Sequence, residues 1–158
     1  MRCVNEDFFN EDYFTLLDIA FKLSDFFEFT IKEESIKVNA DNVLNENLLE
    51  ETYSTVLEPL DEFLIKRKVH RYGNIAHIYG SERKSHVFRY KSIRRAKEVL
   101  KTFTNHAFGW EMGELPEYLA FYSNDKPLFV IVEDEAEIWF YDESEAELIP
   151  TLIERLST

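Results

Sequence analysis

Five basic side chains near the middle of the chain are of the types that bind phosphate. Arg94 and Arg95 fall in the first turn of a predicted helix, and Arg89 and Lys91 stand just before it. Guanidinium groups and the free N–H groups of a helix N-terminus bind phosphate oxygens well. Lys84 is predicted to approach from a hairpin, and aromatic residues between the cations offer stacking surfaces for single-stranded nucleic acid. The spacing predicts a candidate anion site within the basic segment 83–101.

Carboxylates surround an aromatic stretch near the C-terminus. Residues 138–141 are predicted to form a strand, and acidic runs lie at 133–137 and 142–147. Aromatic anchors with a charged rim are typical of a surface that binds a basic protein. Alternation along the strand must also bury one of its sides, so part of the aromatic set is structural. The candidate partner-binding residues are Glu133, Asp134, Glu135, Glu137, Trp139, Tyr141 and Asp142.

A second acidic cluster lies earlier in the chain. Its members are Glu50, Glu51, Glu58, Asp61 and Glu62. Whether this cluster shares a side of the molecule with the first one stays open at this point.

Motifs for catalysis, cofactors and metal ions are missing from the sequence. A hairpin would bring His77 and His86 to one face, but two half-exposed strand histidines are the simpler interpretation. The chain has no Cys pair, no Gly-x-Ser-x-Gly elbow and no Gly-x-Gly-x-x-Gly loop. Acidic residues are so abundant that carboxylate pairs arise by chance. We therefore expect a non-enzymatic protein without a cofactor or a metal site.

Charge is unevenly distributed along the 158 residues. The chain has 18 Lys plus Arg and 31 Asp plus Glu, a net charge of −13. Residues 1–65 (the first acidic block) carry −12, residues 66–106 (the basic block) carry +10, and residues 107–158 (the second acidic block) carry −11. We expect the basic block to face acidic groups of the same fold, of a second copy or of a partner. The flanking acidic blocks disfavour nucleic acid.

The first half of the chain alternates between helical and strand patterns. Apolar periodicity after Asn10 predicts a buried helix, and residues 27–31 alternate as a strand with a return strand at 36–38. A short helix is predicted through 43–49. Another is predicted to open at Glu58-Pro59, with proline at its first position.

The second half reads as a hairpin, a helix and a meander. Residues 75–79 and 86–90 form the predicted hairpin, and Ser92 caps the helix that follows. The predicted meander strands are 118–122, 128–132 and 138–141, and a C-terminal helix is predicted near Pro150.

Separate runs of antiparallel strands with helices between them predict the α+β class. We expect one domain over residues 1–158, with an antiparallel sheet (the hairpin plus the C-terminal three-stranded meander) and helices packed on one face. Its acidic, helix-rich half spans residues 1–69, and its hairpin-helix-meander half spans residues 70–158.

The sequence also predicts a cytoplasmic location. No apolar run follows Arg2 as a signal peptide requires, and the longest apolar runs are far shorter than the roughly 18 residues that span a bilayer. The single cysteine, Cys3, cannot form an intrachain disulfide. We expect no membrane contact and a reducing compartment.

Two functions from different classes remain open. The first is a cytosolic interaction protein whose acidic, aromatic-bearing surface binds and blocks a basic protein. Its overall character is that of immunity proteins, antitoxins and polyanion-mimicking inhibitors. The alternative is a nucleic-acid or phospholigand binding module that uses the segment 83–101. Either function is compatible with a homo-oligomer that pairs basic with acidic surfaces.

Overall fold

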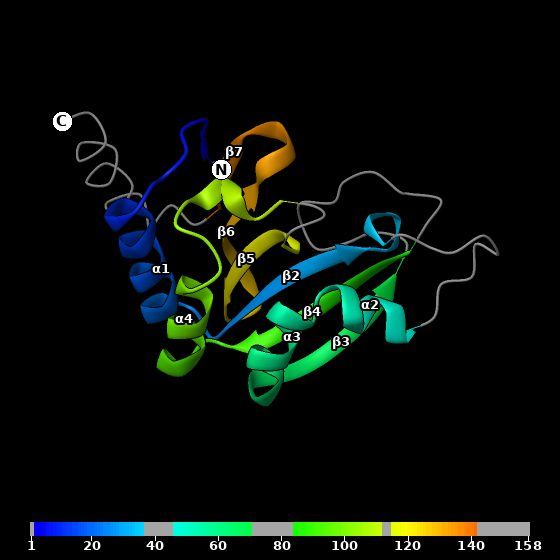
Figure 1. The fold of residues 1–158 in the computed structure, drawn as a ribbon. Coiled ribbons are helices and arrows are strands. Elements are labelled where there is room, and N and C mark those ends of the chain that lie inside the picture. The colour runs from blue at the N-terminus through cyan, green and yellow to red at the C-terminus, as the bar shows by residue number, and fades with distance from the viewer. Residues whose placement is uncertain (1, 37–45, 71–83, 112–114, 142–158) are drawn as a thin grey trace.

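Seven antiparallel strands form one continuous sheet in the computed structural model, which describes residues 2–36, 46–70, 84–111 and 115–141. Their order across the sheet is β1-β7-β6-β5-β2-β4-β3 (Figure 1). Their bounds are β1 (Arg2–Val4), β2 (Phe26–Lys32), β3 (Leu64–His70), β4 (Ser85–Lys91), β5 (Glu117–Ser123), β6 (Lys126–Val132) and β7 (Glu137–Phe140).

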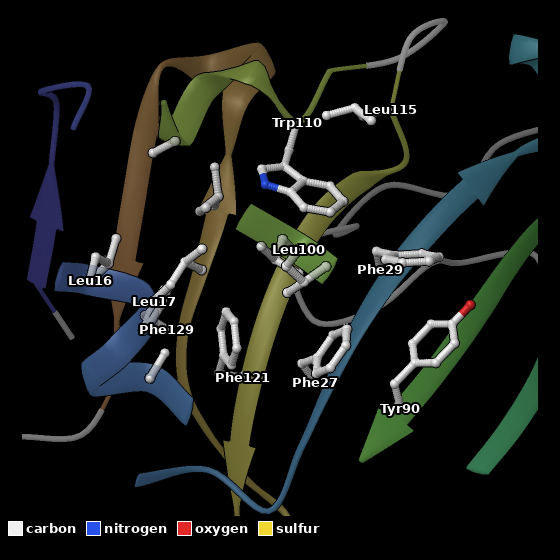
Figure 2. Close-up of a cluster of buried hydrophobic side chains, with 14 of the residues drawn as sticks. Leu16, Leu17, Phe27, Phe29, Tyr90, Leu100, Trp110, Leu115, Phe121 and Phe129 are labelled. Carbon is white, nitrogen blue, oxygen red and sulfur yellow. The ribbon is translucent and has the colours of Figure 1, made fainter. Parts of the chain in front are cut away.

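The α-helices of the described residues bury their apolar sides in one core on one face of the sheet (Figure 1). They are α1 (Glu11–Leu23), α2 (Glu46–Thr52), α3 (Ser54–Leu60) and α4 (Arg94–Lys101). Figure 2 shows leucines and aromatic rings meeting in this core, among them Leu17, Phe27, Trp110 and Phe121. The predicted α+β class, with helices on one face of an antiparallel sheet, is confirmed.

Strand β2 lies in the interior of the sheet, between β5 and β4, and successive side chains point to opposite faces. Phe27 and Phe29 pack into the helix-covered core, whereas Phe26 and Glu28 belong to the opposite face. Since β2 pairs with β5 on one side and with β4 on the other, the two predicted halves of the chain interleave in one sheet.

The opposite face carries a smaller apolar cluster. Phe26 and Tyr122 stack there with ring centroids 4.9 Å apart, and Arg89 lies over the Phe26 ring at 3.9 Å. Tyr118 and Trp139 belong to the same cluster, with 4% and 8% of their surface exposed. The aromatic rings of this face are therefore mainly structural.

Two predicted strand pairings are wrong, and for the same reason. Both edges of β4 are occupied, by β2 and by β3, so the hairpin of residues 75–79 with 86–90 does not form. Both edges of β2 are likewise occupied, and Ile36 follows a 3₁₀ turn, η1 (Glu33–Ser35), instead of starting a return strand. Residues 37–38 and 75–79, including His77, lie outside the described residues.

Two predicted helix starts also differ from the structure. Pro59 lies in the last turn of α3, where Val56 and Leu60, one turn apart, are buried. At α4 the N-cap is Ile93, because the Ser92 hydroxyl instead accepts a hydrogen bond from Ser24 (2.7 Å).

Other predicted elements are confirmed. The helix after Asn10 is α1, and the three meander strands are β5, β6 and β7. The short helix predicted through 43–49 is partly confirmed as α2. Its predicted beginning at 41–45 and the C-terminal helix near Pro150 lie outside the described residues.

Candidate functional site

The acidic residues of the meander largely bond within the fold. They begin in the 3₁₀ turn η4 (Glu133–Glu135), which joins β6 to β7. Glu137 accepts a 2.6 Å hydrogen bond from the Trp139 indole, and Asp134 accepts one of 2.9 Å from the Tyr118 hydroxyl. Of the predicted partner-binding residues, Asp134 and Glu135 are exposed, Tyr141 is half-buried, and Asp142 lies outside the described residues.

Glu133 is an uncharged carboxyl group at neutral pH. Burial, reinforced by the neighbouring charges of Glu117 and Asp134, raises the pKa of Glu133 to about 9. Burial also raises the pKa of Glu117, even though the Lys32 ammonium lies 3.3 Å from its carboxylate. Neither oxygen of Glu133 has a hydrogen-bond partner among the described residues. The negative charge counted from the sequence for the η4 turn is therefore larger than the charge that this turn carries in the folded protein.

The five predicted anion-binding residues do not gather at one place. Lys84 precedes β4 and Lys91 ends it, so they lie roughly 23 Å apart along an extended strand. Arg89 forms a 2.9 Å ion pair with Glu28. Arg95 forms one with Glu62 in the 3₁₀ turn η2 (Asp61–Phe63). Arg94 is exposed at the start of α4.

The basic block is neutralised in large part by the first acidic block. In the described residues, every ion pair of the basic block ends on an acidic residue from positions 1–65. These pairs are Arg67–Glu50, Arg89–Glu28, Arg95–Glu62, Lys97–Asp18 and Lys101–Asp18. The rings of His86 and His106 likewise contact carboxylates of this acidic block, those of Glu33 and Asp7. Among the alternatives left open by the sequence, the geometry thus favours neutralisation within the fold.

Residues of the second acidic cluster line a cavity of about 380 Å³ beside the sheet edge, which we call the α2–η2 cavity. It lies where α2, α3 and the 3₁₀ turn η2 (Asp61–Phe63) meet β3 and β4. The described residues that line it are Glu50, Leu57, Glu58, Asp61, Leu64, Arg67, Phe88 and Tyr90. An adjoining depression of about 390 Å³ shares Glu50 and Glu58 and adds Glu51. Of the second acidic cluster, Glu50, Glu58 and Asp61 thus line this cavity and Glu51 lines the adjoining depression, whereas Glu62 lines neither.

Arg67 occupies one wall of this cavity and is held from several directions. Its guanidinium lies 4.9 Å from the centre of the Phe88 ring and 3.3 Å from Glu50. It also donates to Nδ1 of His86 (3.1 Å), because a guanidinium cannot accept a hydrogen bond. His86 must then carry its proton on Nε2 and donate to Glu33 (2.9 Å). The guanidinium of Arg67 therefore uses much of its hydrogen-bonding capacity on Glu50 and His86 of the same chain.

Three groups of the cavity remain without partners in the described part of the chain. Glu58 and Asp61 are exposed and form no ion pair there. Tyr90 is only 1% exposed and lines the cavity, and its hydroxyl forms no hydrogen bond with another described residue. Burial, followed by the nearby Asp61 charge, raises the pKa of Tyr90, so this hydroxyl keeps its proton. Figure 2 shows the hydroxyl directed away from the Phe27 ring.

The acidic side chains of this cavity were recognisable in the sequence, but the other residues that line it were not. The run 50–62 was visible as an acidic cluster, whereas Arg67, Phe88 and Tyr90 join it only through the pairing of β3 with β4. Leu64 and Tyr90 are register partners in that pairing. The alternation of apolar residues in 86–90 was the available signal for Phe88 and Tyr90.

The described residues contain neither a metal-binding cluster nor a membrane-spanning helix. No group of three or more His, Cys, Asp or Glu side chains is arranged there to hold a metal ion. None of the helices in these ranges combines the length and the apolar composition that crossing a bilayer requires.

Comparison with known proteins gives no relative for this chain: no protein-family model, curated protein or solved structure matches it.

Proposed function

We propose that this chain is a non-enzymatic interaction protein that binds and blocks a basic protein partner. The observation that carries the proposal is the ring of exposed carboxylates around the α2–η2 cavity, in which Glu58 and Asp61 have no cationic partner among the described residues. In this respect the protein would act as immunity proteins, antitoxins and polyanion-mimicking inhibitors do. A reducing cytoplasm is part of the proposal, because the chain has only the single cysteine Cys3.

Electrostatics supports this choice of partner. A net charge of −13 attracts basic proteins over several ångströms and accelerates their association. The internal ion pairs occupy several cations of the basic block, whereas the carboxylates around the cavity outnumber its one guanidinium. An acidic hollow with apolar walls combines a steering charge with a surface that can be dehydrated on binding.

The η4 turn has a secondary role in this proposal. Asp134 and Glu135 contribute exposed charge, but Trp139 is 92% buried and cannot act as a binding anchor without repacking. The centre of the binding surface therefore moves from the C-terminal meander to the α2–η2 region.

A basic peptide tests the proposal. The probe is a fluorescein-labelled peptide of alternating arginine and glycine, followed by fluorescence anisotropy at low and at physiological salt. The double variant Glu58→Gln with Asp61→Asn is expected to weaken binding about tenfold, because two unpaired carboxylates are removed. The matched control, Glu6→Gln with Glu111→Gln, removes two exposed charges elsewhere and should change affinity little.

Two results would contradict the proposal. The first is the absence of peptide binding even at low salt. The second is salt-dependent binding of a single-stranded oligonucleotide that is lost in Arg94→Glu with Arg95→Glu, which would instead favour the nucleic-acid function of the basic segment.

A further inference from the structure

Three arginines of this chain form the same arrangement, a guanidinium between an aromatic ring and a carboxylate. Planar guanidinium groups suit this arrangement because they stack on a ring while donating in their own plane. Arg89 lies 3.9 Å from the centre of the Phe26 ring and 2.9 Å from the Glu28 carboxylate. For Arg67 the distances are 4.9 Å to the Phe88 ring and 3.3 Å to Glu50. For Arg95 they are 5.5 Å to the Phe63 ring and 3.4 Å to Glu62.

One of the three, Arg67 with Phe88 and Glu50, lines the cavity, and the cavity also contains the same components without an arginine between them. Glu58 and Asp61 supply carboxylates that form no ion pair in the described residues, and Tyr90 supplies an aromatic lining residue. Leu57 and Leu64 add apolar walls that suit the methylene groups of a long basic side chain. A volume of about 380 Å³ lies at the lower end of the range of small-ligand sites.

The Tyr90 hydroxyl points to a ligand independently of the acidic charge. The Tyr90 side chain is 99% buried and lines the cavity, and its hydroxyl has no hydrogen-bond partner among the described residues. Because the hydroxyl keeps its proton, its oxygen lone pairs are free to accept from a cationic N–H group.

We propose that the cavity binds one arginine side chain of the basic partner, an inference that rests on the proposed function. The guanidinium donates to the Asp61 and Glu58 carboxylates and to the Tyr90 hydroxyl, and its methylene groups contact Leu57 and Leu64. Arg67 does not compete for these groups, since its own guanidinium is held by Glu50 and His86.

Arginine fits this site better than lysine or an anion. A guanidinium offers five N–H donors in one plane and can reach two carboxylates and a hydroxyl together, whereas an ammonium has three donors and is more strongly hydrated. An anion would meet three carboxylates, Glu50, Glu58 and Asp61, against the single cation Arg67.

The test separates the cavity from the acidic surface as a whole. N-acetyl-arginine amide and N-acetyl-citrulline amide, which differs by lacking the positive charge, are titrated into the isotope-labelled protein and followed by NMR. We expect the arginine amide to shift the signals of Asp61 and Tyr90 and the citrulline amide to have little effect. Equal shifts from both compounds would overturn the inference, because recognition would not depend on the guanidinium charge.

Tyr90→Phe provides the sharper variant. Since the hydroxyl has no partner in the described residues, its removal should leave the fold intact, and we expect binding of the arginine–glycine peptide to weaken about fivefold. Tyr141→Phe, at a half-buried tyrosine belonging to the opposite face, is the matched control and should change nothing.

The outcomes also distinguish this inference from the proposed function. If the peptide binds the parent protein and the Tyr90→Phe variant equally well, the cavity inference is wrong while the proposed function stands. If the arginine amide shifts Asp61 and Tyr90 but the peptide does not bind, the cavity inference stands and the proposed function is wrong.

Discussion

Replacing Glu133 by glutamine is expected to stabilise the protein at neutral and alkaline pH. The native Glu133 carboxyl holds a proton because burial raises its pKa from the ordinary value of 4.5 to about 9. Glutamine has nearly the same shape and is neutral at every pH. The variant therefore keeps the uncharged state that the fold favours, without the cost of keeping a carboxyl protonated.

The size of the effect follows from the proton balance. Between pH 4.5 and 9 the folded protein holds one proton more than the unfolded chain, so the free energy of unfolding falls as pH rises. The loss is up to about 1.4 kcal/mol for each pH unit. Between pH 6 and pH 8, Glu133→Gln should thus gain roughly 3 kcal/mol over the parent protein.

Urea unfolding at a series of pH values measures this difference directly. Groups that are the same in both proteins cancel in the comparison, whereas Glu135→Gln, on the same turn but exposed, should follow the parent. A stability difference between Glu133→Gln and the parent that stays constant from pH 6 to pH 8 would refute the protonated state of Glu133.

Two further predictions concern buried polar contacts, and urea unfolding at neutral pH checks both. Tyr13→Phe leaves the Trp110 indole N–H, which donates to the Tyr13 hydroxyl at 2.8 Å, buried without a partner and should cost about 1–3 kcal/mol. An unchanged unfolding midpoint would contradict that role. Arg89→Met leaves the Glu28 carboxylate, 8% exposed, without its ion pair and should cost about 3 kcal/mol. Adding Glu28→Gln should recover part of that loss, and a further loss instead would argue against the pairing.

The sequence predicted which segments form strands and helices better than it predicted which strands lie next to one another. Alternation in 27–31 and short apolar runs in the three meander stretches are local properties, so these strands were found. The position of β2 between β5 and β4 depends on contacts far apart in sequence, which no local pattern encodes. Residues 75–79 have strand-forming composition, yet the edges of β4 were already occupied by β2 and β3.

Prediction of the site from the sequence was limited in the same way, because local patterns do not show which side chains the fold brings together. Counting charges identified the acidic run around Glu133 but could not reveal that this carboxyl is buried and neutral. Nor could it reveal that Glu137 bonds Trp139 or that the run 50–62 borders a cavity. Charge counts along a chain indicate the sign of the charge that a partner would carry, and the fold decides which side chains can reach that partner.

The most direct test of the account is an NMR map of where the arginine–glycine peptide binds. The account predicts shifted backbone signals around the α2–η2 cavity, in residues 50–67 and 88–90, with little change at residues 133–137. Shifts confined to 133–137, or the absence of any shift at low salt, would contradict the claim that this acidic cavity is the binding site.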